Sequence, residues 1–140
     1  METIPNLGIG AIDAQHMLLV QLLARLSATI NAFGPKDQLI RLLREIKKYA
    51  EYHFTSEENY MEDIAYPRRA EHARHHSEML AELSLRIGRA NSSWRHAGEV
   101  EEFLQAWLAR HIRVEDQKLV DFALGLKHAG RDDGTGRGAS

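Results

Sequence analysis

Residues 36–62 read KDQLIRLLREIKKYAEYHFTSEENYME, and their periodicity limits the folds that the chain can adopt. Apolar side chains recur every three or four residues, which is the spacing of one face of an amphipathic helix. Toward the end of this segment, a histidine and a glutamate one helical turn apart continue the same face. The face consists of Leu39, Leu42, Leu43, Ile46, Ala50, His53 and Glu57. The sequence thus predicts a helix whose inward side changes from apolar to polar.

Three more segments have the same periodicity. They cover residues 13–33, a segment that follows Tyr66-Pro67 and ends at about residue 88, and residues 97–127. Asp13 is the expected N-cap of the first helix. Gly34-Pro35 and Tyr66-Pro67 interrupt the pattern, and residues 88–98 (GRANSSWRHAG) have the composition of a loop. Because short connections favour antiparallel neighbours, we predict an all-α, up-down-up-down four-helix bundle.

Composition indicates one globular domain. The chain has 140 residues, 44% of them hydrophobic and 27% charged, so we expect a domain over residues 1–127 and a disordered, glycine-rich tail over 128–140. A formal net charge of −2 does not favour a nucleic-acid partner. The N-terminus lacks a signal-peptide pattern, and the longest apolar run, MLLV, is too short to span a membrane. Cysteine is absent. We therefore expect a cytoplasmic protein without thiolate ligands or a membrane partner.

Each predicted helix places histidine on its apolar stripe. A buried imidazole or carboxylate needs a hydrogen-bonding partner or a metal. In an up-down bundle, the start of the first helix, the end of the second, the start of the third and the later part of the fourth lie at one end. At a rise of about 1.5 Å per residue, the groups can meet at one level. They are His16, His53, Glu57, His72, His76 and His111.

Other histidines and acids have simpler explanations. A single core histidine is more often hydrogen-bonded than metal-bound, so only the combination of pairs and singles at one level favours a metal site. His75 lies off the line that joins His72 and His76, and we expect it to be solvated. His96 and His128 are expected at the surface. Surface positions are also expected for Glu51, Glu58, Glu78 and Glu82.

Five motifs resemble those of the hemerythrin family, in particular its single-domain bacterial members, the bacteriohemerythrins. The resemblance covers most of residues 8–122. A histidine in the first helix followed by HxxxE, HxxxH and HxxxxD is a highly specific ordered set. The matching stretches are IDAQH at 12–16, HFTSE at 53–57, YMEDIAYP at 60–67, HARHH at 72–76 and WLARHIRVED at 107–116.

The resemblance implies an oxo- or hydroxo-bridged pair of non-haem irons. One iron would be bound by His72, His76 and His111, and the other by His16 and His53. Both would share Glu57 and Asp116 as bridging ligands, and the second iron would keep a coordination position open for dioxygen. Seven protein ligands favour a dinuclear site over one tetrahedral zinc. Imidazole and carboxylate donors by themselves suit iron, manganese or zinc.

Periodicity and resemblance disagree at the end of the last motif. In a regular α-helix, position i+4 returns to nearly the same face, whereas i+5 lies about 140° away. Periodicity alone therefore chooses Glu115 as the partner of His111, while the family pattern chooses Asp116. We adopt Asp116, whose side chain would reach the cluster from the edge of the stripe.

The family resemblance implies reversible binding of dioxygen as a hydroperoxide on the open iron, for storage, delivery or sensing. An oxygen-consuming enzyme would be the recipient, and we do not expect the chain to be an enzyme itself. The alternatives are a di-iron oxidoreductase acting on peroxide or nitric oxide, and an iron- or oxygen-responsive regulatory module. The residues that match the family's oxygen pocket, which also suit plain core packing, are Leu19, Phe54, Trp107, Leu108 and Ile112.

Overall fold

The computed structural model describes the backbone of residues 8–93 and 95–135, and the side chains of this part through residue 126. Within these limits the chain is helical and contains no strand. The elements are α1 (Gly10–Asn31), α2 (Lys36–Asp63), α3 (Arg69–Ser92), α4 (His96–His111), the π-helical turn η1 (Ile112–Asp116) and α5 (Gln117–Thr135). The last three follow each other without a break and form one long rod.

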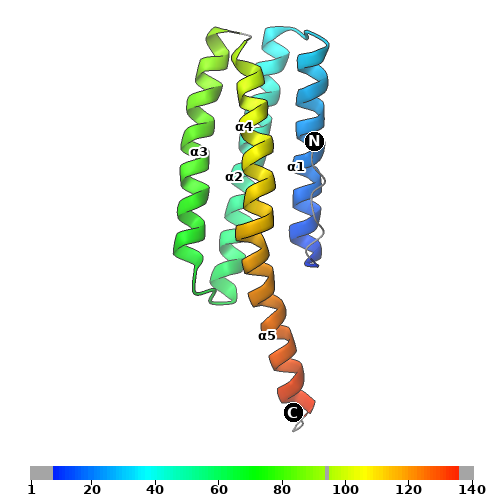
Figure 1. The fold of residues 1–140 in the computed structure, drawn as a ribbon, viewed down its shortest axis with the longest axis vertical. Helices are drawn as coiled ribbons and strands as arrows, with labels where there is room; N and C mark the ends of the chain where they lie inside the picture. Colours follow the sequence, from blue (N-terminus) through cyan, green and yellow to red (C-terminus); the bar gives the residue numbers. More distant parts are fainter. Residues whose placement is uncertain (1–7, 94, 136–140) are drawn as a thin grey trace.

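The helices form an antiparallel bundle (Figure 1). Helix α1 packs against α2 and α4, and α3 packs against the same two helices. Helix α5 extends the α4 rod past the end of the bundle at which α1 begins and α2 ends. The predicted all-α, up-down-up-down four-helix bundle is confirmed, and its fourth helix corresponds to α4, η1 and the first part of α5.

Each of the two short connections contains a residue in the left-handed region directly after the C-cap. Phe33 has φ 52° after α1, and Ala65 has φ 53° after α2. Such residues end a helix because their N–H groups turn back onto its last carbonyls, as the Ala65 N–H does onto the Glu62 oxygen at 3.1 Å. Pro35 then precedes α2 as its N-cap residue. These turns reverse the chain and make neighbouring helices antiparallel.

Several predicted helix limits differ from the structure. The prediction of Asp13 as an N-cap was wrong, because α1 begins earlier and the Asp13 carboxylate instead accepts a hydrogen bond from the Gly8 N–H at 3.0 Å. Helix α3 continues into the predicted loop as far as Ser92, since this polar stretch contains no proline to stop it, and α4 begins at His96. Helix α5 reaches Thr135, eight residues into the expected tail, and residues 136–140 lie outside the described part of the chain.

The two halves of the core, divided along the length of the bundle, differ in chemistry. Leu26, Leu39, Leu43 and Leu83 are fully buried in an apolar half. Burying one such side chain contributes about 1.5–3 kcal/mol to folding. Buried polar side chains occupy the other half, at the end where α1 begins and α2 ends. The stability of the first half allows the second half to hold groups that would otherwise oppose folding.

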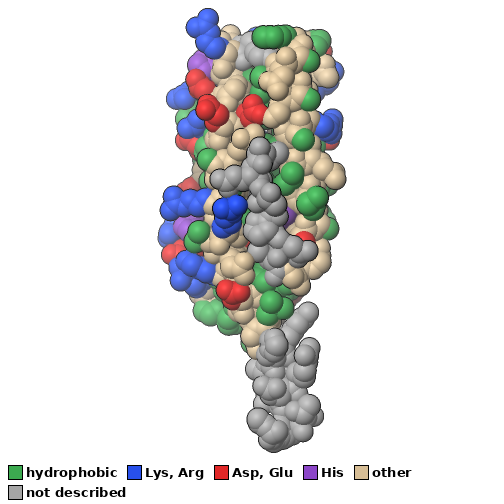
Figure 2. Space-filling model, turned by 45° about the vertical axis from the view of Figure 1, so that its right-hand side comes forward, with side chains coloured by type: hydrophobic (Ala, Val, Ile, Leu, Met, Phe, Trp, Pro, Cys, Tyr) green, Lys and Arg blue, Asp and Glu red, His purple; other side chains and the backbone are tan. Residues whose placement is uncertain are grey.

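The surface is chemically mixed. On the face drawn in Figure 2, basic and acidic side chains lie interspersed with apolar ones. Many of the charges are paired along a helix, such as Arg86 with Glu82 at 2.6 Å and Lys47 with Glu51 at 3.9 Å. No helix in the described residues is long and apolar enough to cross a membrane.

Candidate metal centre

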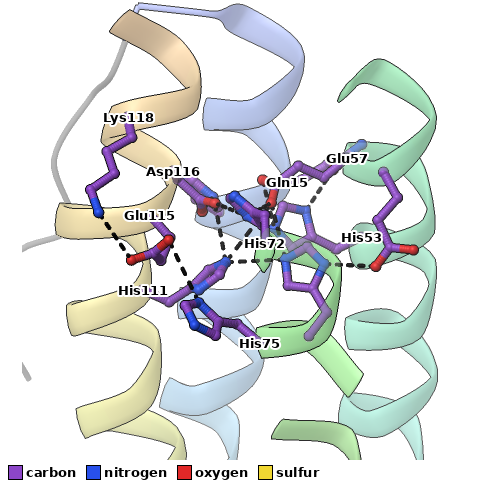
Figure 3. A network of polar contacts seen from close by, with 12 residues as sticks. Gln15, His53, Glu57, His72, His75, His111, Glu115, Asp116 and Lys118 are labelled. Carbon is purple, nitrogen blue, oxygen red and sulfur yellow. Dashed lines mark hydrogen bonds and ion pairs between the residues drawn. The ribbon is translucent and has the colours of Figure 1, made fainter. Parts of the chain in front are cut away.

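Seven side chains converge inside the polar end of the bundle (Figure 3). Helix α1 contributes one, α2 and α3 contribute two each, and α4 and η1 contribute one each. All seven are buried, with at most 4% of any of them exposed. They are the seven residues predicted from the sequence to bind metal, namely His16, His53, Glu57, His72, His76, His111 and Asp116.

The cluster divides into two overlapping sets of metal-ligating atoms. The larger set contains His72, His76 and His111, and the smaller set contains His16 and His53. Both sets also contain the same two carboxylates, and the ligand atoms within each set lie within 4.8 Å of one another. Two groups of histidines that share two carboxylates form the donor pattern of a dinuclear centre.

Glu57 presents one carboxylate oxygen to each set of histidines. Its Oε1 lies 2.7 Å from Nε2 of His72 and 3.1 Å from Nε2 of His76. Its Oε2 faces the other way, 3.7 Å from Nε2 of His53. Glu57 reaches both sets because it lies one turn after His53 on the buried face of α2. A carboxylate in this position can bridge two metal ions.

Asp116 divides its two oxygens in the same way. Oδ1 lies 3.0 Å from Nε2 of His72 and 3.1 Å from Nε2 of His111, both in the larger set. Oδ2 lies 3.0 Å from Nε2 of His16, which belongs to the smaller set. Glu57 and Asp116 together therefore provide two carboxylate bridges between the same two positions.

The π-helical turn η1 explains how Asp116 reaches the cluster. A π-turn joins residues five apart instead of four, so it brings position i+5 onto the face that i+4 would occupy in a regular α-helix. Asp116 is fully buried, whereas Glu115 points outward and lies 3.6 Å from both His75 and Lys118 (Figure 3). The choice of Glu115 from periodicity was therefore wrong, because it assumed a regular helix after His111.

The pKa values of the two carboxyl groups in the cluster are lowered by the surrounding imidazoles. Burial opposes ionisation of Glu57, but hydrogen bonds from the imidazoles outweigh it and lower the pKa of the carboxyl group to about 2. The pKa of Asp116 is likewise held well below its usual range, against burial, by His111 and the other imidazoles. Both groups are therefore anionic at neutral pH.

The pKa values of the histidines shift in opposite directions. Burial disfavours the charged form of His72, yet hydrogen bonds to Asp116 and Glu57 raise the pKa of its imidazole to about 9. The pKa of His111 is also raised, against burial, by the charge of Asp116. Burial dominates at His53 and lowers the pKa of its imidazole to about 4. The two anions therefore require positive charge around them, which protons or metal ions can provide.

Two imidazoles have polar partners on the side away from the cluster. Nδ1 of His76 lies 2.8 Å from Glu58 Oε2, and Nδ1 of His53 lies 2.6 Å from Gln15 Oε1. Neither role was predicted from the sequence: Glu58 was expected at the surface, and no role was expected for Gln15. The available signal was adjacency, because each residue is next to a ligand candidate in the chain and lies at the edge of the buried face.

Aromatic rings fix the orientation of two histidines. The Phe54 ring stacks on the His76 imidazole with centroids 3.9 Å apart and planes 5° apart. The half-buried Trp107 ring stacks on His111 at 4.2 Å and 14°. These rings block rotation of the imidazoles, so the direction of each Nε2 is set by packing as well as by hydrogen bonding.

A small apolar cavity of about 20 Å³ lies beside the cluster. Its volume corresponds to about one water molecule, but an apolar lining offers no partners for water and favours a dry space. Ile112, expected in this pocket, is fully buried but does not line the cavity, since it lies one turn beyond Leu108. The lining consists of Leu19, Leu23, Ile46, Ala50, Phe54, Met79, Leu104, Trp107 and Leu108.

The donor set fits a pair of metal ions. Five imidazoles present Nε2 atoms and two carboxylates present both of their oxygens, all from rigid helices. Within the described part of the chain, Glu57 Oε2 is buried without a hydrogen-bond partner, and such an atom is costly unless a cation binds it. Imidazole and carboxylate without thiolate are suitable ligands for iron. All seven residues would hold the ions, with Glu57 and Asp116 bridging them.

Removing the metal is expected to lower the melting temperature of the chain. A ligand that binds only the folded state stabilises it by about 2.7 kcal/mol when its free concentration is 100 times its Kd. Circular dichroism melts of iron-loaded protein before and after chelation measure the difference. His75→Ala should preserve it, because His75 belongs to neither set, and His76→Ala should lose most of it. Equal melting temperatures for loaded and chelated wild-type protein would contradict the expectation.

Comparisons with known proteins agree with this geometry. Residues 7–123 match a family model described as the hemerythrin HHE cation binding domain. The bacteriohemerythrin of Clostridium acetobutylicum is 28% identical over 121 residues, which cover 83% of this chain and 94% of that protein. The bacteriohemerythrins of Stenotrophomonas maltophilia and Pseudomonas aeruginosa are 29% and 30% identical, in each case over 83% of this chain and 75% of the relative.

Proposed function

The chain belongs to the hemerythrin family, and from this we propose that it is a non-haem di-iron protein that binds dioxygen reversibly. The observation that carries the proposal is the unequal division of histidines around shared carboxylates. Three imidazoles serve one position and two serve the other, so the second position has one protein donor fewer. A diatomic gas can take the place of that missing donor.

The surroundings of the cluster support binding of a gas rather than chemistry on a polar substrate. The cavity beside it is lined by apolar side chains and the half-buried Trp107. No acid or base lines this cavity that could deliver a proton to a molecule inside it. Excluding water and proton donors in this way favours release of a bound gas over its conversion.

In this proposal the metal centre and the protein side chains have different roles in binding dioxygen. A di-iron centre supplies the electrons with which dioxygen is held. The imidazoles and carboxylates orient both positions, and Glu57 and Asp116 keep them at a fixed separation. Leu108 and Phe54, which are buried against the cavity, exclude water from the same space. Storage, delivery to an oxygen-consuming enzyme and sensing all require these same properties.

Cycling between anaerobic and aerobic conditions tests the proposal. The iron-loaded protein is reduced without air, exposed to oxygen and then freed of oxygen, while the visible spectrum is recorded. We expect a charge-transfer band that appears with oxygen and disappears without it over repeated cycles. One-way bleaching with consumption of peroxide or nitric oxide would instead support a di-iron oxidoreductase. A purified protein that contains zinc and shows no oxygen-dependent band would contradict both functions.

A further inference from the structure

We propose that Glu58 and Gln15 make the two metal positions electronically unequal, with each residue acting as a positioning residue for one histidine. Glu58 acts through His76 on the three-histidine position, and Gln15 acts through His53 on the two-histidine position. The inference rests on the di-iron part of the proposed function and is independent of reversible dioxygen binding.

Glu58 holds His76 in one tautomer. An ionised carboxylate can accept hydrogen bonds but cannot donate them. The His76 Nδ1–H therefore donates to Glu58 Oε2, which lies 2.8 Å away. The lone pair then lies on Nε2, which faces Glu57 Oε1 at 3.1 Å inside the cluster. The stacked Phe54 ring keeps the imidazole in this plane. An anionic acceptor hydrogen-bonded to the outer nitrogen also makes the inner nitrogen a stronger electron-pair donor to a metal.

Gln15 performs the same positioning without a charge. Its Oε1 accepts a hydrogen bond from the His53 Nδ1–H at 2.6 Å. Its Nε2 donates to the Ser56 hydroxyl at 3.0 Å, which fixes the orientation of the amide. The lone pair of His53 therefore also lies on the inward Nε2, but its outer partner is neutral. Helix α2 thus carries both His53 and Ser56, the two groups that hold this amide.

Two of the three remaining outer nitrogens leave this contrast unchanged, because one lies on each side of the cluster. Nδ1 of His16 and Nδ1 of His72 are buried and have no hydrogen-bond partner among the residues that the structure describes. Among the outer nitrogens of these four imidazoles, only that of His76 has an anionic partner, Glu58, which lies on the three-histidine side. An extra negative charge stabilises the more positive state of the nearest metal. We infer that the three-histidine position is the harder one to reduce.

Charge-changing variants at the two outer positions provide the test. Spectroelectrochemical titration of iron-loaded protein gives the reduction potential for Glu58→Gln, Gln15→Glu and wild type. Glu58→Gln keeps an acceptor for His76 and removes the charge, so we expect reduction to become about tenfold more favourable, or about 59 mV per electron. Gln15→Glu should shift the potential in the opposite direction.

Glu51→Gln is the matched control for loss of one negative charge. Glu51 lies on the same helix, is 43% exposed compared with 39% for Glu58, and pairs with Lys47. Its removal should leave the potential near the wild-type value, because Glu51 pairs with Lys47 and not with an imidazole of the cluster. An exposed charge without such a direct contact is screened over about 8–10 Å. Glu58→Ala, which removes the hydrogen bond as well, should also weaken iron binding by about 10–100-fold.

The outcomes separate this inference from the proposed function. Equal potentials for Glu58→Gln and Glu51→Gln, or an unchanged potential in Glu58→Gln, overturn the inference even if the wild type binds dioxygen reversibly. If the reduction potential changes in Glu58→Gln but not in Glu51→Gln, and the protein does not release dioxygen, the result supports the inference and contradicts the proposed function. A wild-type chain that takes up fewer than two irons overturns both.

Discussion

Replacing Asp116 by Asn should remove at least one of the two irons, although the side chain keeps its size. Asp116 is fully buried, and its two oxygens face opposite sets of histidines. An amide offers one oxygen and one nitrogen whose lone pair is unavailable, so it can bind one ion and cannot bridge two. We expect the affinity for iron to fall by more than the roughly 10–100-fold that is typical of outer-shell changes.

Iron content per chain after loading, followed by the visible spectrum, measures this effect. Glu115→Gln is the matched control, since Glu115 is the adjacent acid and lies between His75 and Lys118 on the outer side of the turn. It should bind two irons as the wild type does. Loss of iron in Glu115→Gln with retention in Asp116→Asn would mean that the last helix is regular in solution and that Glu115 is the ligand.

The turn at Asp116 shows where sequence reasoning stops. Apolar periodicity predicts the four helices correctly, because an amphipathic stripe has the same spacing in any regular helix. Periodicity fails over Ile112–Asp116, where one additional residue per turn changes which side chains share a face. Nothing in the composition of this segment indicates the wider turn. Only the resemblance to a family, or the structure itself, places Asp116 inward.

The cluster was predictable for a different reason from its outer partners. His53 and Glu57 interrupt an apolar stripe, and such an interruption is visible in the sequence as an unsatisfied buried group. Glu58 and Gln15 are charged or polar residues at the edge of a stripe, where a solvated side chain is the usual expectation. Their roles depend on the distance to an imidazole on a neighbouring helix, which a linear pattern does not contain.

Replacing Leu108 by Asp should convert the proposed reversible oxygen binding into rapid, one-way oxidation. Leu108 is 6% exposed and lines the apolar cavity together with Phe54 and Trp107, whose rings stack on two histidines of the cluster. A carboxyl group there brings water and a proton donor into a space that is lined by apolar side chains and Trp107. A positioned acid typically accelerates a proton transfer by 10²–10⁴-fold, so we expect the oxygen-dependent band to decay about 10²-fold faster.

The decay rate of this band in air, measured on iron-loaded protein with a circular dichroism spectrum to verify folding, tests the role of Leu108. Leu108→Met is the packing control and should decay slowly, because a volume-conserving change costs under about 1.5 kcal/mol and adds no strong polar group. Leu85→Asp adds the same charge at an exposed position on α3 and should also decay slowly.

Leu108→Asn replaces Leu108→Asp in the test if the aspartate prevents folding, since the amide admits water without adding a carboxyl group. If all four variants decay at the wild-type rate, water exclusion by Leu108 does not control the lifetime of the oxygen-bound form.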